Sequence, residues 1–373
     1  MENTRLTAYL NKNIQNLLTS AVKHLPLNPR ESAFLLSQIK YQADNAAKRR
    51  RFEEDGTHIP AFLIASITDE CNLHCAGCYA RANGICTDRP SLPLADSAHV
   101  PMDTGEWEKI FSEAAYLGIS FILLAGGEPF MSIGVLERAA EFKSIIFPVF
   151  TNGTILTEKE TGLLDKNRNL IPIFSIEGSK EETNCRRGAG TWEAVHTAAQ
   201  TLRGMGILFG ASITVTAENA EEVTRPSFAA ELKDAGVRIF IYVEYTAAAG
   251  CGHTLELTPE LRSAFLSRLD SLRTELPSVI IIAFPGDEQA LGGCLAGGRG
   301  FFHISPYGAA EPCPFSPYSD RNLRRCSLLD AISSPLFAEL KTAGLTGGEH
   351  DGGCVLAQHD HEVQDILTKT KGR

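Results

Sequence analysis

The stretch Cys71-Asn-Leu-His-Cys-Ala-Gly-Cys-Tyr-Ala80 places three thiols, those of Cys71, Cys75 and Cys78, close together along the chain. Thiolates three and four residues apart on one loop can each bind a different iron of a [4Fe-4S] cluster and leave the fourth iron open. The same spacing also suits a structural zinc knuckle. The apolar run Ala61-Phe-Leu-Ile-Ala-Ser-Ile-Thr68 just upstream predicts a buried strand that ends at this loop, where α/β barrels carry their chemistry.

A second strand-and-loop pattern follows, in which Phe121-Ile-Leu-Leu-Ala125 runs into Gly126, Gly127, Glu128 and Pro129. Adjacent glycines let a ligand approach the backbone, and a carboxylate complements an ammonium group. Glycine pairs after strands are common on their own. Together with a cysteine loop on the preceding strand, however, they favour an iron-sulfur site over a zinc knuckle.

These two motifs, in this order, resemble those of the radical S-adenosylmethionine (SAM) enzymes. The resemblance implies that Cys71, Cys75 and Cys78 hold a [4Fe-4S] cluster and that the glycine-rich loop binds the methionyl amine of SAM. It further implies that the reduced cluster cleaves SAM to a 5'-deoxyadenosyl radical, which abstracts hydrogen from the substrate. The family usually has an aromatic residue directly before the third cysteine, whereas this chain has Gly77 there and Tyr79 after it.

The composition of the chain indicates a cytoplasmic metalloenzyme. Its 373 residues are 43% hydrophobic, which suffices for a barrel and a smaller domain. Its ten cysteines are too sparse for a secreted disulfide scaffold, and the first residues lack the apolar core of a signal peptide. The net charge of -10 disfavours nucleic acid and anionic membranes as partners.

The pattern of apolar residues predicts four regions. We expect an N-terminal helical segment (1–57), a TIM-like partial (β/α)6 barrel (58–250), a connecting helical region (251–293) and a small C-terminal cluster domain (294–373). The basic run Lys48-Arg-Arg-Arg51 is interpreted as solvated surface, with a dock for an acidic partner as the alternative. Six strands are predicted in the barrel, near 61–68, 120–125, 146–151, 171–176, 207–215 and 237–244.

Polar residues follow the third and fourth predicted strands. Asn152 either faces a cofactor or belongs to a plain Asn-Gly turn. The stretch around Ser175 and Glu177, with Arg187 beyond it, is similar to one in peptide-modifying radical SAM enzymes. That similarity implies that Ser175 or Glu177 meets the ribose hydroxyls of SAM and that Arg187 binds its carboxylate, although Glu177 stands where aspartate is usual and could face the substrate instead.

The sixth predicted strand and two further cysteines provide candidates for catalysis. Tyr242 and Glu244 alternate onto one face of the strand, and we expect that face to point into the barrel. Glu244 is then either functional or part of a buried salt bridge. Cys185 and Cys251 could donate a hydrogen atom to a substrate radical, or could be small buried residues.

A second set of cysteines begins beyond residue 290. Cys294, Cys313 and Cys354 resemble the ligands of the SPASM or twitch extension of radical SAM enzymes, in which cysteines around a β-hairpin hold an auxiliary [4Fe-4S] cluster. A hairpin is predicted from Phe301 to Gly308 and beyond. The fourth ligand of this second cluster is left open between Cys326, Cys86 and no protein ligand, because Cys326 and Cys86 each also suit a structural role.

The resemblance implies a peptide or small-molecule substrate and an electron donor such as flavodoxin or ferredoxin. The auxiliary cluster would assist electron transfer or substrate binding. The alternative hypothesis is a protein of a different class, an iron-sulfur electron-transfer or scaffold protein without radical chemistry. The glycine-rich loop argues against that class, because a scaffold needs no amine-binding loop.

Overall fold

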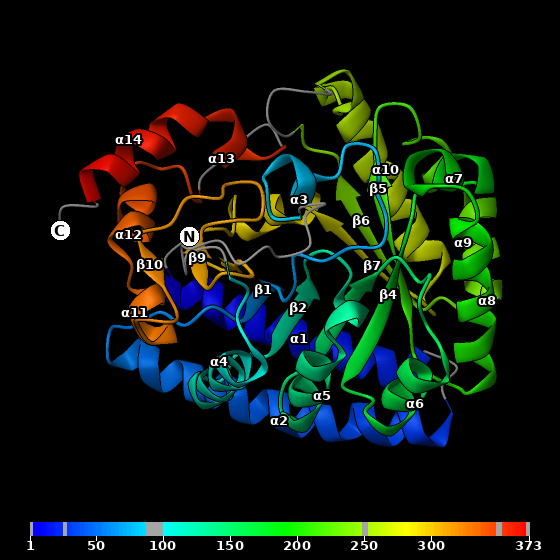
Figure 1. The fold of residues 1–373 in the computed structure, drawn as a ribbon, viewed down its shortest axis with the longest axis horizontal. Helices are drawn as coiled ribbons and strands as arrows, with labels where there is room; N and C mark the ends of the chain where they lie inside the picture. Colours follow the sequence, from blue (N-terminus) through cyan, green and yellow to red (C-terminus); the bar gives the residue numbers. More distant parts are fainter. Residues whose placement is uncertain (1–2, 25–27, 87–99, 248–252, 348–352, 371–373) are drawn as a thin grey trace.

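The fold is built on one ten-stranded sheet (Figure 1). In this computed structural model, residues 3–24, 28–86, 100–247, 253–347 and 353–370 are described. The strand order is β10-β9-β8-β1-β2-β3-β4-β5-β6-β7, and neighbours from β8 through β7 pair in parallel. The strands are β1 (Phe62–Ser66), β2 (Phe121–Ala125), β3 (Phe147–Thr151), β4 (Leu170–Ile176), β5 (Gly210–Val215), β6 (Ile239–Glu244), β7 (Ile280–Phe284), β8 (His303–Ile304), β9 (Ala309–Glu311) and β10 (Arg321–Asn322).

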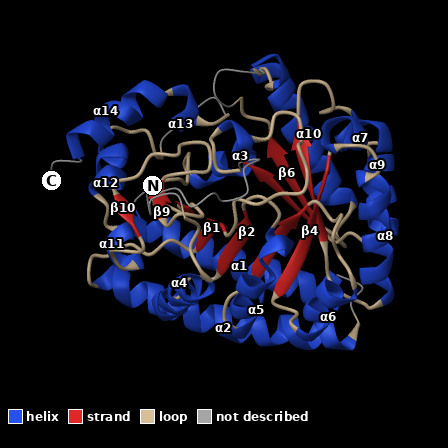
Figure 2. Ribbon diagram, viewed as in Figure 1, coloured by secondary structure: helices blue, strands red, loops and turns tan. Residues whose placement is uncertain are grey.

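Helices surround the sheet (Figure 2). Local sequence sets their ends. Asp103 and Glu106 form a capping box at the start of α4, and Gly118 ends that helix in the left-handed conformation. The helices are α1 (Asn3–His24), α2 (Pro29–Glu54), α3 (Tyr79–Ala82), α4 (Thr104–Leu117), α5 (Ile133–Glu141), α6 (Glu158–Lys166), α7 (Lys180–Arg187), α8 (Thr191–Gly204), α9 (Pro226–Ala235), α10 (Pro259–Glu275), α11 (Leu328–Ile332), α12 (Pro335–Thr342), α13 (Val355–Gln358) and α14 (Asp360–Thr370).

The partial parallel barrel and its six predicted strands are confirmed, but the barrel has one strand more than expected. β7 pairs in parallel with β6 within the region 251–293, which we predicted to be a helical connection. Its sequence Ile280-Ile-Ile-Ala-Phe284 is rich in β-branched residues and carries the signal of a strand. The region therefore continues the barrel after α10.

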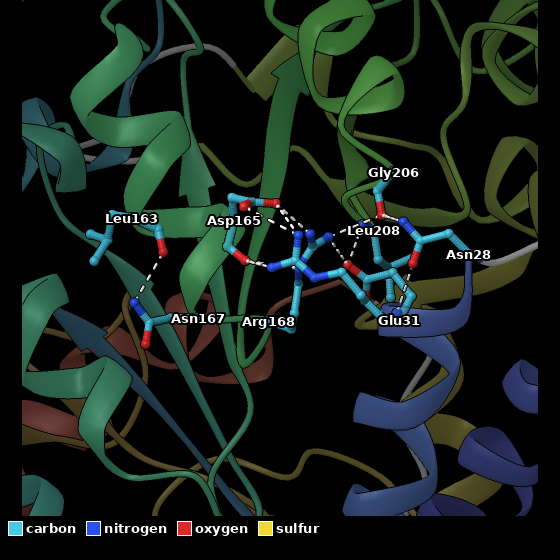
Figure 3. A network of polar contacts seen from close by, with 9 residues as sticks. Asn28, Glu31, Leu163, Asp165, Asn167, Arg168, Gly206 and Leu208 are labelled. Atoms are coloured by element: carbon cyan, nitrogen blue, oxygen red, sulfur yellow. Dashed lines mark hydrogen bonds and ion pairs between the residues drawn. The ribbon is translucent and has the colours of Figure 1, made fainter.

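The N-terminal helices are tied to the barrel by buried polar contacts (Figure 3). Arg168, which follows α6, forms an ion pair with Glu31 of α2, and these side chains are 7% and 2% exposed. Leu208 N–H donates to the same carboxylate at 3.2 Å, and Asn28 Nδ2 donates to Gly206 O at 2.8 Å. The N-terminal segment is thus an integral layer of the fold.

The basic run at the end of α2 is only partly solvated. Arg49 is 1% exposed, and its guanidinium donates to Ser120 Oγ at 2.8 Å and to the carbonyl of Gly118. Burial lowers the pKa of Arg49 to about 10. The interpretation of this run as solvated surface is therefore wrong for Arg49, which anchors α2 to the loop before β2.

The C-terminal hairpin joins the barrel through β1. β8 pairs in parallel with β1, and β9 returns antiparallel beside β8, which confirms the predicted hairpin. The fully buried His303 bonds Ser66 Oγ of β1 at 2.8 Å and Glu311 of β9 at 2.7 Å. The second cysteine set is thereby brought beside the cysteine loop that follows β1. Within the described ranges, no helix combines the length and the hydropathy that a membrane span needs.

Candidate active site

The first cysteine loop follows β1 and ends at α3, for which Cys78 is the N-cap. Cys71, Cys75 and Cys78 are all partly exposed. The loop is pinned to the end of α7: Ala76 N–H donates to Arg186 O at 2.8 Å, and Arg186 Nε donates back to Ala76 O at 3.1 Å. Burial raises the pKa of Cys75, and the nearby positive charge of Arg187 opposes that rise.

The glycine-rich loop packs against the cysteine loop. Gly127 N–H donates to Thr68 O at 2.8 Å, and Glu128 N–H donates to Glu70 O at 2.7 Å. A Cβ on Gly127 would lie 1.9 Å from Glu70 O, so any side chain there would force the loops apart. The glycines are therefore required by this close approach of two backbones, a reason that the sequence analysis did not consider.

Glu128 does not stand free beside the glycines. Its buried carboxylate accepts hydrogen bonds from Thr151 Oγ1 at 2.8 Å, Asn152 N–H at 2.7 Å and Phe130 N–H at 3.2 Å. Burial raises the pKa of Glu128 to about 7. The Asn152 side chain donates at 2.8 Å to Asn72 of the cysteine loop. Glu128 and Asn152 thus tie the ends of β2 and β3 to that loop, and Pro129 begins a buried turn beside them.

Glu177, Arg186 and Arg187 meet at the carboxyl end of β4. Both guanidinium groups pair with Glu177 Oε1, Arg186 at 2.5 Å and Arg187 at 2.6 Å. Although burial opposes it, Glu177 and Cys75 raise the pKa of Arg187. Glu177 Oε2 is buried and accepts no hydrogen bond from the described residues. The two arginines converge, so Arg186 joins Arg187, the arginine predicted from the sequence, at this site. Ser175 of β4 lies two residues before Glu177, and it pairs with Ser212 of β5.

Tyr242 and Glu244 face the opposite side of the sheet from the one predicted. Tyr242 Oη donates to Val223 O at 2.9 Å, and its ring packs edge-on against Phe265 of α10. Glu244 accepts a hydrogen bond from Arg262 of α10 at 2.7 Å. The shared face was predicted correctly, but it meets the outer helix, and Glu244 forms the salt bridge that was the alternative.

Tyr245, which directly follows Glu244 and has the opposite orientation, points at the cysteine loop. Its Cε2 and hydroxyl oxygen lie 3.1 Å from where a Cβ on Gly77 would stand. Gly77 has a φ of +65°, which disfavours a side chain for a second reason. An aromatic ring from the residue after β6 therefore occupies the space before the third cysteine, a contact that no local sequence pattern indicates.

The structure does not bring Cys185 to this site, because Cys185 is exposed on α7. A donor to a substrate radical would have to face the barrel interior. Cys251 lies outside the described residues.

The second cysteine set converges from three segments. Cys313 and Cys354 lie within hydrogen-bonding distance of each other, and Cys354 is the N-cap of α13. Cys294 lies close enough to interact electrostatically with both. Arg299 braces the Cys294 loop by donating to the carbonyls of Gly293 and Cys294 at 2.8 and 3.0 Å. Three thiols from distant positions thus converge on one region, where Cys294 and Cys313 are buried and Cys354 is partly exposed.

The two candidates for a fourth ligand, Cys326 and Cys86, do not lie with this set. Cys326 Sγ donates to Asn322 O at 3.3 Å, and the charged groups near it are Asp330, Arg321 and Glu113. Cys86 is buried beside Cys78 and Cys71, and burial raises its pKa to about 12. Cys326 is placed as a structural residue, and Cys86 belongs to the surroundings of the first loop.

Tyr79 connects the two cysteine sets. It follows Cys78, and its ring packs edge-on against Phe315, two residues beyond Cys313, with centroids 5.3 Å apart. Asn83 Nδ2 donates to Pro314 O at 3.1 Å in the same contact. Within the described ranges, no three His, Cys, Asp or Glu side chains converge tightly enough for a single metal ion. A cubane places each thiolate on a different iron and does not need such convergence.

Residues 65–225 match the model of the Radical SAM superfamily. This part of the chain is therefore a Radical SAM domain. It is 26% identical over 295 residues to the AdoMet-dependent heme synthase of Methanosarcina barkeri, covering 72% of this chain and 80% of that protein. It is 27% identical over 266 residues to the PqqA peptide cyclase of Granulibacter bethesdensis, covering 68% and 67%. The crystal structure of Streptococcus suis SuiB bound to precursor peptide SuiA has the same fold, with a TM-score of 0.61 at 17% identity, covering 84% and 72% of the two chains.

The chain is therefore a radical SAM enzyme, and its cofactors are a [4Fe-4S] cluster and SAM. The residues described above fit these groups. The cysteine loop, the end of the glycine-rich loop, Glu177 and Tyr245 all lie at the carboxyl ends of the parallel strands. The buried Oε2 of Glu177 accepts no hydrogen bond from the described residues, so it can accept one from a bound ligand.

Proposed function

We propose that this radical SAM enzyme modifies a peptide, with one cluster on Cys71, Cys75 and Cys78 and an auxiliary cluster on Cys294, Cys313 and Cys354. The observation that carries the proposal is the packing of the two cysteine sets against each other through Tyr79 and Phe315. Because this contact puts the two cysteine sets side by side, an auxiliary cluster here could exchange an electron with a substrate bound next to both.

The side chains around the first loop have distinct tasks in this proposal. Arg187 binds the SAM carboxylate, because a guanidinium forks onto a carboxylate. Glu177 accepts a ribose hydroxyl on Oε2 while its other oxygen orients Arg187. Glu128 positions the glycine-rich loop through β3 and does not bind the methionyl amine directly. When bound, the reduced cluster supplies the electron that cleaves SAM and so starts hydrogen abstraction.

A peptide substrate is supported by two of the similar proteins, the PqqA peptide cyclase and SuiB with its precursor peptide. The likeness to the AdoMet-dependent heme synthase supports a second candidate, a small organic molecule. A flavodoxin or ferredoxin would deliver the electron, as predicted from the sequence.

The test is anaerobic reconstitution followed by two assays. Protein treated with dithionite and SAM should release 5'-deoxyadenosine, whereas a scaffold or electron-transfer protein would only cycle its clusters. Candidate substrates labelled with deuterium are then added, and 5'-deoxyadenosine is analysed by mass spectrometry. Deuterium transferred from peptides supports the proposal, and transfer only from small molecules overturns the choice of substrate class.

A further inference from the structure

We propose that Glu288 is a ligand of the auxiliary cluster and binds the iron that Cys294, Cys313 and Cys354 leave open. This inference rests on the proposed function, because it takes the second cysteine set to hold a cluster. Its basis is the position of one buried carboxylate.

Glu288 lies against the two residues that flank Cys294. It lies in the 3-10 turn Gly286–Leu291 and is 4% exposed. Its backbone carbonyl accepts a hydrogen bond from Gly293 N–H at 3.0 Å, and its carboxylate lies near Leu295 N–H. The residues on both sides of Cys294 therefore lie against Glu288, Gly293 at its backbone and Leu295 at its carboxylate.

One oxygen of this carboxylate has no partner. Glu288 Oε1 is buried, and none of the described residues donates a hydrogen bond to it. Arg299 is the nearby cation, yet its guanidinium donates to the carbonyls of Leu291, Gly293 and Cys294, and within the described ranges it forms no ion pair with Glu288. A buried, ionised carboxylate without a donor is costly, so such a group either binds a cation or takes up a proton.

The surroundings of Glu288 point to a cation at the cysteines. Cys354 and Cys294 both lie close enough to interact with it electrostatically, and each loses a proton on binding iron. Glu244 also has an unpaired oxygen, but its other oxygen pairs with Arg262, and no cysteine of the described ranges is among its interacting charges. Carboxylates bind iron in many proteins, and the ligand set tunes a cluster's spectrum and potential.

The experiment isolates the auxiliary cluster in the full chain by replacing Cys71, Cys75 and Cys78 with alanine. In that background, Glu288→Gln is compared with Glu288→Cys and with the matched control Asp287→Asn. Asp287 is the adjacent acid, and its carboxylate pairs with Arg273 instead. Electron paramagnetic resonance of the reduced protein is recorded, and the share of [3Fe-4S] signal is measured after mild oxidation.

Glu288→Gln should change the reduced spectrum and at least double the [3Fe-4S] share, because its fourth iron would lack an anionic ligand. Glu288→Cys should keep four irons and give a different spectrum, and Asp287→Asn should match the parent. A parent-like spectrum and parent-like oxidation in both Glu288 variants would overturn the ligand assignment while leaving the auxiliary cluster intact. Absence of iron from the parent itself would instead overturn the auxiliary cluster, and with it this inference.

Discussion

The ring of Tyr245 lies over Gly77, with its hydroxyl oxygen 3.1 Å from the position of a Cβ on that glycine. An aromatic side chain from the end of β6 thus stands where related enzymes carry one in the cysteine loop itself. Tyr242 lies three residues earlier, an odd number, so strand alternation turns it to the opposite face, where it meets α10.

We therefore expect Tyr245 to flank the adenine of SAM. Stacking of a base on an aromatic ring contributes about 1 to 3 kcal/mol. Tyr245→Ala should weaken SAM binding by roughly one order of magnitude or more, whereas Tyr245→Phe should bind nearly normally. Equilibrium dialysis with radiolabelled SAM measures this. Tyr242→Phe is the control, and an unchanged dissociation constant in Tyr245→Ala would refute the assignment.

Substitutions of Arg186 and of Arg187 should have different effects, on iron retention and on SAM binding respectively, although both side chains contact Glu177. Arg187→Ala should weaken SAM binding by about one to two orders of magnitude, because a charge-assisted hydrogen bond contributes roughly 1.5 to 3 kcal/mol. Arg187→Lys should recover only part of this, because it lacks the planar fork. Iron content should stay normal in both variants.

Arg186→Ala should mainly lower iron retention, because Arg186 donates to Ala76 O within the cysteine loop. Iron analysis and SAM dialysis on the same preparations separate the two effects. If Arg186→Ala lost SAM affinity at normal iron content while Arg187→Ala behaved as the parent, the roles would be exchanged.

Removing Arg168 should destabilise the fold, because the buried carboxylate of Glu31 would lose its ion pair and keep only the hydrogen bond from Leu208 N–H. Breaking a buried ion pair costs about 3 to 5 kcal/mol. Arg30→Ala is the matched control: its ion pair with Asp165 is exposed, and such pairs contribute about 0 to 1 kcal/mol. Urea unfolding followed by circular dichroism should show a clearly lower midpoint for Arg168→Ala alone. Equal urea midpoints in the two variants would mean that the Arg168–Glu31 ion pair does not stabilise the packing of α2 on the barrel.

Local patterns predicted the features that local chemistry determines. The cysteine loop, the first six strands and the C-terminal hairpin follow from residue spacing and β-branched runs, and the structure has them. β7 carried the same signal in Ile280–Phe284 and was overlooked. The alternation of β6 showed that Tyr242 and Glu244 share a face, but only the packing of α10 decides that this face points outward.

Contacts between distant segments could not be predicted in this way. Nothing near Gly77 indicates that a ring from β6 covers it, and no pattern distinguishes Glu288 from an exposed acid in a turn. Glu128 was expected to complement SAM because it follows two glycines. Its partners Thr151 and Asn152 belong to the next strand and the residue after it, so their claim on the carboxylate appears only when β2 and β3 lie side by side.

Iron content distinguishes one cluster from two. Anaerobically reconstituted protein should carry about eight irons per chain, and replacement of Cys71, Cys75 and Cys78 by alanine should leave about four. Cys326→Ala should change nothing, because Cys326 bonds Asn322 O away from both sets. Iron that stays near four in the fully reconstituted, unmodified chain would contradict a second cluster.

The last prediction separates the tasks of the two cysteine sets. SAM needs only the open iron at the first loop, so Cys294→Ala and Cys313→Ala should still release 5'-deoxyadenosine while losing turnover of the true substrate. The hairpin that carries Cys313 is held to β1 by His303, Ser66 and Glu311, so loss of the second cluster need not disturb the barrel. Chromatography of 5'-deoxyadenosine and of product on the same samples measures both activities. If the variants kept a folded structure and the first cluster but lost SAM cleavage, then the second set would support the first directly, through the Tyr79–Phe315 contact that joins them.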